Sequence, residues 1–122
     1  METQDLGKTS TGMQANVAAL LSYVVGWITG LIFFLIEKEN KFVRFHALQS
    51  IIVFGGLCVF QIVIGAFMAI GLSFMAPLFS LVTGLVALLA FILWIVLMIK
   101  AYQGEMFKLP VAGDIAEKNT QK

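Results

Sequence analysis

The stretch EKENKFVRFHALQS, residues 37–50, separates two long apolar segments and decides how the chain is organised. It holds the only histidine and five charged residues, in a chain with eight basic and seven acidic side chains in all. The segments on either side are almost wholly aliphatic, aromatic, Gly or Ala. We therefore expect a short polar connection between two apolar helices.

The composition excludes an ordinary soluble domain. Of the 122 residues, 60% are hydrophobic and 12% are charged, and the mean hydropathy is +0.95. Three apolar segments, 17–36, 45–70 and 77–99, could each cross a bilayer core of about 30 Å at about 1.5 Å per residue. The sequence therefore predicts an all-α, polytopic integral membrane protein whose transmembrane domain, 16–100, is a three-helix bundle.

The charges predict an orientation in the cell membrane, because Lys and Arg in short loops are retained on the cytoplasmic side. Lys38, Lys41 and Arg44 lie between the first two segments, and four lysines follow the third. The connection 71–76 has no cation, and only Lys8 precedes the first segment. A multi-pass protein with its N-terminus outside and its C-terminus in the cytoplasm is predicted.

The two ends of the chain are more polar than its centre. We expect residues 1–15 to form a disordered tail. Residues 101–122 are expected to form a cytoplasmic tail with a short interfacial segment, because Pro110 and Gly113 interrupt its loosely spaced apolar residues.

The polar connection supplies the first candidate contacts. Asn40 is a suitable N-cap for a helix that begins at Lys41. At 100° per residue, that helix carries Phe42, His46 and Gln49 on one side.

We assign a partner or lipid contact to Glu37, Arg44, His46 and Gln49. For His46, a structural bond to Glu37 or to a helix-end carbonyl is favoured over a proton relay. Arg44 is suited to a lipid phosphate, to pairing with Glu37, or to both.

One further polar side chain lies within the apolar segments. Gln61 could contact a substrate or partner, or make an interhelical hydrogen bond worth about 1 kcal/mol, and the second interpretation is favoured.

Small residues predict where the helices pack, because close approach of membrane helices needs them at the interface. The expected packing residues are Ala18, Ser22, Gly26, Gly30, Gly65, Ser80, Gly84 and Ala87. A bundle filled in this way leaves little room for a pore, so any conduction pathway would form between protomers or with a partner.

Signatures of catalysis are missing. With one His, one mid-segment Cys and acidic residues only outside the apolar segments, we find no triad, metal-ligand spacing or phosphate loop. The near-balanced charge offers no basic block for nucleic acid. We therefore predict a non-enzyme without cofactor or metal, whose partners are the bilayer and either its own copies or another membrane protein.

The segments FVRFHALQS, residues 42–50, and KAYQGEMFKLPVAGDIAEK, residues 100–118, carry a family resemblance. The chain resembles small, largely uncharacterised prokaryotic membrane proteins related to the twenty-kilodalton subunit of the chloroplast inner-envelope import translocon. The resemblance implies residence in the cell membrane of a bacterium or archaeon. The plastid members are described with four spans and work beside partners. The resemblance to the prokaryotic members implies no particular activity for this chain.

Two functions follow as hypotheses. The first is a non-enzymatic assembly, scaffold or translocon-like subunit that acts through helix packing. The alternative is a small transport or channel protein whose pathway forms only in an oligomer and is lined by Gln61, Gln49 and His46.

Overall fold

The computed structural model describes residues 6–71 and 73–120, and every regular element in that part of the chain is a helix. The predicted all-α class is confirmed. The elements are α1 (Ala15–Val24), α2 (Trp27–Ile36), α3 (Lys41–Ala69), the short 3-10 helix η1 (Ser73–Met75), α4 (Ala76–Tyr102) and α5 (Ala112–Thr120).

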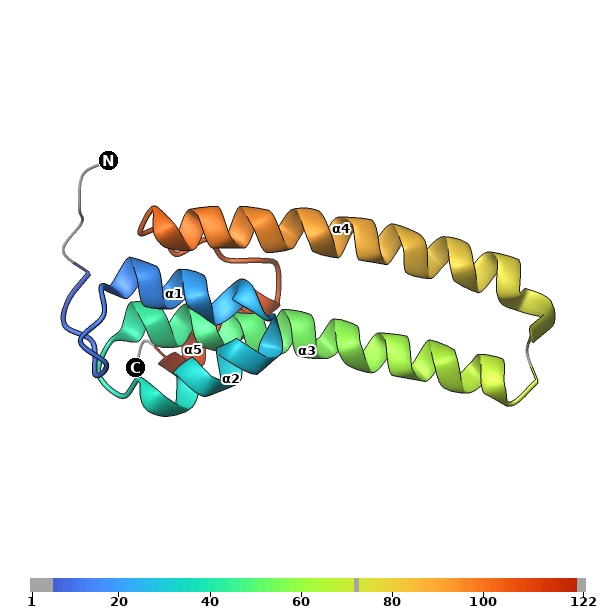
Figure 1. The fold of residues 1–122 in the computed structure, drawn as a ribbon, viewed down its shortest axis with the longest axis horizontal. Coiled ribbons are helices and arrows are strands. Elements are labelled where there is room, and N and C mark those ends of the chain that lie inside the picture. Colours follow the sequence, from blue (N-terminus) through green and yellow to red (C-terminus); the bar gives the residue numbers. More distant parts are fainter. Residues whose placement is uncertain (1–5, 72, 121–122) are drawn as a thin grey trace.

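The helices α3 and α4 form a long antiparallel hairpin (Figure 1). They have 29 and 27 residues, about 43 and 40 Å at 1.5 Å per residue. Within the described ranges they are the two helices that are long and apolar enough to cross a membrane. The prediction of three spans is therefore not confirmed.

The first apolar segment is broken at its centre. Gly26 has a φ of 65°, a left-handed conformation that favours glycine. On either side, α1 and α2 have ten residues each and reach about 15 Å, half of a bilayer core. They run in opposite directions (Figure 1), and Ser10 N–H donates to the Glu37 carboxylate at 2.8 Å. The segment 17–36 thus folds back on itself instead of continuing as one long helix.

Side chains satisfy the backbone groups that this break exposes. Thr29 Oγ1 accepts the Val25 N–H at 3.1 Å and donates to the Gly26 carbonyl at 3.3 Å. Ser50 Oγ, from α3, donates to the same carbonyl at 2.9 Å. Because unpaired backbone groups are costly in apolar surroundings, these bonds stabilise the turn between α1 and α2.

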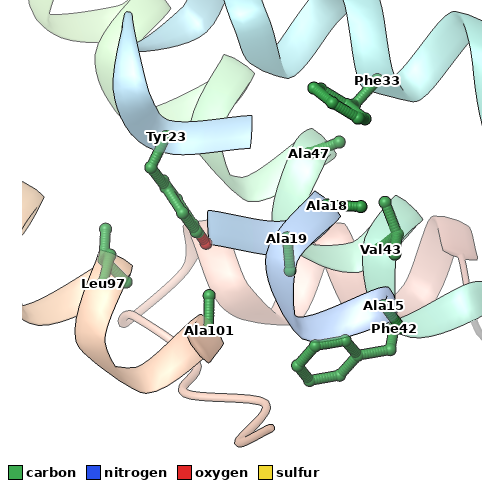
Figure 2. Close-up of a cluster of buried hydrophobic side chains, with 10 residues drawn as sticks. All are labelled: Ala15, Ala18, Ala19, Tyr23, Phe33, Phe42, Val43, Ala47, Leu97 and Ala101. Atoms are coloured by element: carbon green, nitrogen blue, oxygen red, sulfur yellow. The ribbon is translucent and has the colours of Figure 1, made fainter. Parts of the chain in front are cut away.

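Buried side chains gather at one end of the molecule, which we call the head. It comprises α1, α2, the first ten residues of α3, the last turns of α4, and α5 (Figure 1). From residue 51 to residue 96, with residues 72 and 73 left aside, no side chain is buried. The core cluster consists of Ala15, Ala18, Ala19, Tyr23, Phe33, Phe42, Val43, Ala47, Leu97 and Ala101 (Figure 2).

The predicted packing residues divide between the two ends of the molecule. Ala18, Ser22 and Gly30 are buried in the head, and Gly26 forms the turn. Outside the head the small residues are exposed, and a Cβ added at Gly65 or Gly84 would meet no atom within 4 Å. The exposed members are Gly65, Ser80, Gly84 and Ala87. The small residues thus pack α1 and α2 onto α3, whereas a tight bundle along the whole length is not observed.

The contact between α2 and α3 leaves no space at Gly30. A Cβ there would lie 2.9 Å from the Ala47 carbonyl oxygen and 3.0 Å from Cβ and Oγ of Ser50. Since the first of these atoms is backbone, it cannot rotate away, and α2 itself would have to move.

We expect Gly30→Ala to lower the free energy of unfolding by about 1–3 kcal/mol, the usual cost of overpacking. Gly56→Ala is the matched control, because a Cβ at Gly56 meets nothing within 4 Å and alanine favours a helix. Thermal unfolding of both variants in the same detergent, followed by circular dichroism, measures the difference. Equal stability of the two variants would contradict the close contact.

The expected tails stay predictions. Residues 1–5, 121 and 122 lie outside the described residues. Among the others, Leu6 and Lys8 accept hydrogen bonds from Asn40, which favours an ordered segment over a disordered one. Residues 112–120 form α5, which packs on α3.

Candidate functional site

The loop between α2 and α3 is built on two polar residues that the sequence singled out. Asn40 caps α3, because its Oδ1 accepts the Val43 N–H at 3.0 Å, as predicted. Glu37 is fully buried and accepts from Glu39 N–H at 3.1 Å and from Asn40 N–H at 3.0 Å. The carboxylate therefore folds the loop around itself.

The same carboxylate holds the segment that precedes α1. Ser10 N–H donates to both Glu37 oxygens, at 3.0 and 2.8 Å. In return, Ser10 Oγ accepts the Lys38 and Glu39 N–H groups at 2.9 and 3.2 Å. We call this reciprocal contact the N-terminal clasp.

Burial and hydrogen bonding act in opposite directions on Glu37. Burial disfavours the charged carboxylate, but the N–H groups of Asn40, Ser10 and Glu39 outweigh it, and the pKa of Glu37 is lowered from its ordinary 4.5. The charged form is thus the one that the folded loop selects.

The N-terminal clasp should open in acid. Because the folded pKa of Glu37 is lowered, its stabilisation is complete above pH 4.5 and is lost as the pH falls below that value through the lowered pKa. We expect the amide resonance of Ser10 to move upfield over that range in an NMR titration in micelles. Glu37→Gln is the control and should show no such transition; a transition retained there would assign it to another group.

A second polar cluster joins three helical side chains in the head. Tyr23 Oη lies 2.7 Å from His46 Nδ1 and accepts Gln49 Nε2–H at 3.0 Å. All three side chains are fully buried. His46 Nε2 lies 2.8 Å from the Glu105 carbonyl oxygen, which can only accept, so the proton is on Nε2 and the Tyr23 hydroxyl donates to Nδ1.

Gln49 uses its whole amide group in this cluster. Besides Tyr23, its Nε2 donates to the Phe107 carbonyl at 2.9 Å, and its Oε1 accepts the Leu109 N–H at 2.9 Å. The side chain thus pairs with the chain at residues 107 and 109 as a neighbouring strand would.

These bonds fasten the C-terminal arm, which we define as residues 103–120. Its anchored residues, 105, 107 and 109, alternate along the chain, as in an extended segment. Met106 and Leu109 pack against the core cluster. The sequence predicts a partner or lipid contact for His46 and Gln49, but in this structure they bind the chain's own arm.

Arg44 lies beside this cluster rather than within it. Its Nη1 donates to the carbonyls of Phe34 at 3.1 Å and Glu37 at 2.7 Å, and its guanidinium lies 4.3 Å from the centre of the Phe34 ring. The expected pairing with Glu37 thus uses the backbone carbonyl of that residue and not its carboxylate. Arg44 thus supplies a donor to carbonyl groups at the C-terminus of α2, where a cation is favourable.

Gln61 lies apart from both clusters. Its side chain is exposed on α3, within a stretch of aliphatic and aromatic residues. The interhelical bond favoured from the sequence is not made within this chain, in which Gln61 has no side-chain hydrogen bond to any described residue.

Sequence reasoning missed Tyr23, Ser10 and Trp94 as parts of the head. Trp94 Nε1 donates to the Tyr23 carbonyl at 2.6 Å and so ties α4 to α1. The burial of Tyr23 could have been predicted, because Tyr23 lies four residues after Ala19, on the same side of the helix as the small residues. Ser10 carried no such signal, since it precedes every periodic segment.

The described residues form an apolar pocket but no cluster of metal-ligating side chains. No group of three or more His, Cys, Asp or Glu among them could hold a metal ion. A shallow apolar pocket of about 330 Å³ lies between α1 and α4 and has no charged lining; it is lined by Leu20, Ile95, Met98, Ile99, Tyr102 and Gln103.

Comparison with known proteins gives a consistent family. The model of the magnetosome magnetite crystal formation protein family matches residues 8–116. A UPF0132 membrane protein of Methanocaldococcus jannaschii is 54% identical over 116 residues, which are 95% of this chain and 97% of the relative.

Two further archaeal relatives are also UPF0132 membrane proteins. One from Archaeoglobus fulgidus is 50% identical over 87% of this chain and 95% of its own length. A second from M. jannaschii is 45% identical over 88% of this chain and 71% of its own length. No solved structure matches the chain. These findings agree with the resemblance to prokaryotic membrane proteins and give no support to a relationship with the chloroplast translocon subunit.

Proposed function

The chain belongs to the magnetosome magnetite crystal formation protein family, and from that premise we propose that it is a non-enzymatic membrane subunit that assembles with copies of itself. The family description names crystal formation, whereas the archaeal relatives are described only as membrane proteins. Assembly within a membrane is the role that the fold itself supports.

The proposed topology has two spans, α3 and α4, and a re-entrant hairpin formed by α1 and α2. The hairpin reaches about halfway into the bilayer core, and the outer side of α2 offers it exposed apolar residues such as Leu31 and Leu35. Both ends of the described chain then lie on one side of the membrane. This arrangement differs from the outside N-terminus expected from three spans.

The distribution of cations supports an orientation in which the head lies at the cytoplasmic side of the membrane. Every described Lys and Arg belongs to the head or to the segments attached to it, whereas the connection at the far end, 70–76, has none. The described cations are Lys8, Lys38, Lys41, Arg44, Lys100, Lys108 and Lys118. Since such residues are retained in the cytoplasm, one orientation accounts for all of them, including Lys8.

Self-assembly is carried by one observation, the exposed amide of Gln61. An amide without a hydrogen-bond partner is costly in hydrocarbon, and Gln61 lies in the apolar part of α3, where exposed neighbours include Ile62 at 66%. The same residue on a second copy offers both the donor and the acceptor that the amide lacks. A pair of α3 helices in contact would satisfy both amides.

The test is the number of copies per complex in lipid bilayers, measured by single-molecule photobleaching of labelled protein. We expect multimers for the wild-type protein and a shift to monomers for Gln61→Leu. Gln14→Leu, just before α1, where the exposed side chain makes no capping hydrogen bond, is the matched control and should leave the multimers intact.

Two results would overturn this function. Monomers of the wild-type protein at all protein-to-lipid ratios would remove self-assembly. Multimers of Gln61→Leu that have lost a solute flux present in wild-type liposomes would favour the oligomeric transport pathway in its place.

A further inference from the structure

The C-terminal arm is joined to the rest of the molecule at a single sharp turn. Gly104 has a φ of 82°, and its N–H and that of Glu105 donate to the carbonyls of Ala101 and Lys100 at 3.1 and 3.0 Å. These bonds end α4 in a left-handed glycine turn. Beyond this turn the chain leaves α4.

The arm binds to a helix other than the one that carries it. Of the described elements, α5 contacts α3 alone. The extended part is likewise anchored on α3, through His46 and Gln49. Two contacts of Lys100 link the arm to α4: an ion pair with Glu105 at 3.1 Å and a contact of its Nζ with the Phe107 ring, 5.9 Å from the ring centre. The Lys100 and Glu105 side chains are partly exposed, so the contribution of the ion pair is small.

The arm also keeps its shape through contacts of its own. Gly113 N–H donates to the Leu109 carbonyl at 2.8 Å, and Lys108 Nζ lies 3.2 Å from Glu117 Oε1. A Cβ on Gly113 would lie only 2.6 Å from the Lys108 Cα, which shows how closely this turn is folded. The extended part and α5 can therefore move as one unit.

The groove on α3 binds the arm mainly through the backbone atoms of the arm. His46 and Gln49 form hydrogen bonds with backbone atoms of residues 105, 107 and 109. Met106 and Leu109 pack against the core cluster. Main-chain bonds with alternate side chains in pockets are how grooves bind extended peptides in general. The groove on α3 therefore fits the arm of a neighbouring copy as well as its own.

We propose that the arm is exchanged between adjacent copies, so that the arm of one chain occupies the α3 groove of another. This inference rests on the proposed self-assembly. Copies in one membrane stand parallel with their heads at the same level, so each groove lies at the height of its neighbour's arm. Exchange of an identical element is a low-cost way to link protomers, and here it would join the heads while Gln61 joins the spans.

Photo-crosslinking within full-length chains tests the exchange. One tagged copy carries Phe107→p-benzoylphenylalanine, a replacement that leaves the main-chain bonds of residue 107 in place; the other copy is wild-type with a second tag. After illumination of membranes containing both, we expect covalent dimers in which position 107 is linked to residues 41–50 of the other copy. Gln49→Leu in the receiving copy should remove this product.

A second position separates failure of the exchange from failure of the assembly. Phe67→p-benzoylphenylalanine reports contact between the spans, because Phe67 is exposed on α3 far from the arm. Dimers from position 67, with position 107 linked only within its own chain, would overturn the exchange and leave the assembly standing. Dimers from neither position would overturn both, and dimers from position 107 to α4 alone would show lateral packing without exchange.

Discussion

Gln49→Leu is expected to detach the C-terminal arm and to lower the free energy of unfolding by about 2–5 kcal/mol. The substitution removes three hydrogen bonds, those to Tyr23, Phe107 and Leu109. Each bond contributes about 1 kcal/mol, and each buried group left without a partner costs about 1–3 kcal/mol. Leucine has a similar volume, so the loss reports the amide and not a cavity.

Hydrogen exchange of residues 105–120 and trypsin cleavage after Lys108 measure the detachment. Both should increase markedly in Gln49→Leu. Gln61→Leu makes the same chemical change on an exposed part of the same helix and should leave the stability of the detergent-solubilised monomer within about 0.5 kcal/mol of the wild type. An arm that stays protected in Gln49→Leu would show that α5 and the contacts of residues 105, 106 and 109 hold it without Gln49.

Glu37→Ala is expected to lower the free energy of unfolding by about 2–4 kcal/mol, because it removes the acceptor of the Ser10 and Asn40 N–H groups and one of the two acceptors of the Glu39 N–H. Bonds to a charged group contribute about 1.5–3 kcal/mol each, and part of this is recovered where water reaches the exposed Ser10. The loop and the N-terminal clasp should loosen together.

The matched control for Glu37→Ala is Glu39→Ala, two residues away. The Glu39 side chain is exposed, and only its backbone N–H takes part in the loop. Urea unfolding in detergent should place Glu39→Ala near the wild type and Glu37→Ala well below it. The same loss in both variants would mean that charge near the α3 N-terminus, and not the buried acceptor, sets the stability.

Hydropathy and local rules predicted much of this fold. The helical class, the cap of α3 at Asn40 and the shared side of Phe42, His46 and Gln49 follow from composition, capping chemistry and a 3.6-residue period. The same rules predict one span over residues 17–36, because the summed hydropathy of a window is the same for one long helix and for two short helices joined by a turn. The turn at Gly26 is fixed by Ser50 of α3, a contact that no local pattern contains.

The candidate site was found in part for a similar reason. His46 and Gln49 were recognised as polar residues in an apolar chain, but their partners are backbone atoms almost sixty residues away. Backbone carbonyl and N–H groups occur at nearly every residue, so the side chains of residues 103–111 do not show which of them bond to Gln49. The buried state of Glu37 was hidden as well, because its partners are the N–H groups of its own loop and of Ser10.

The fold-back of the first apolar segment is the central claim, and the sidedness of three single cysteines tests it most directly. In a Cys58→Ser background, Thr11→Cys, Phe74→Cys and Asn119→Cys mark the N-terminal segment, the far end of the hairpin and α5, at positions that are all exposed. With an impermeant maleimide on intact cells, we expect labelling of Phe74→Cys alone, and of all three after permeabilisation. Labelling of Thr11→Cys in intact cells, with Asn119→Cys protected, would contradict the re-entrant hairpin and restore three spans.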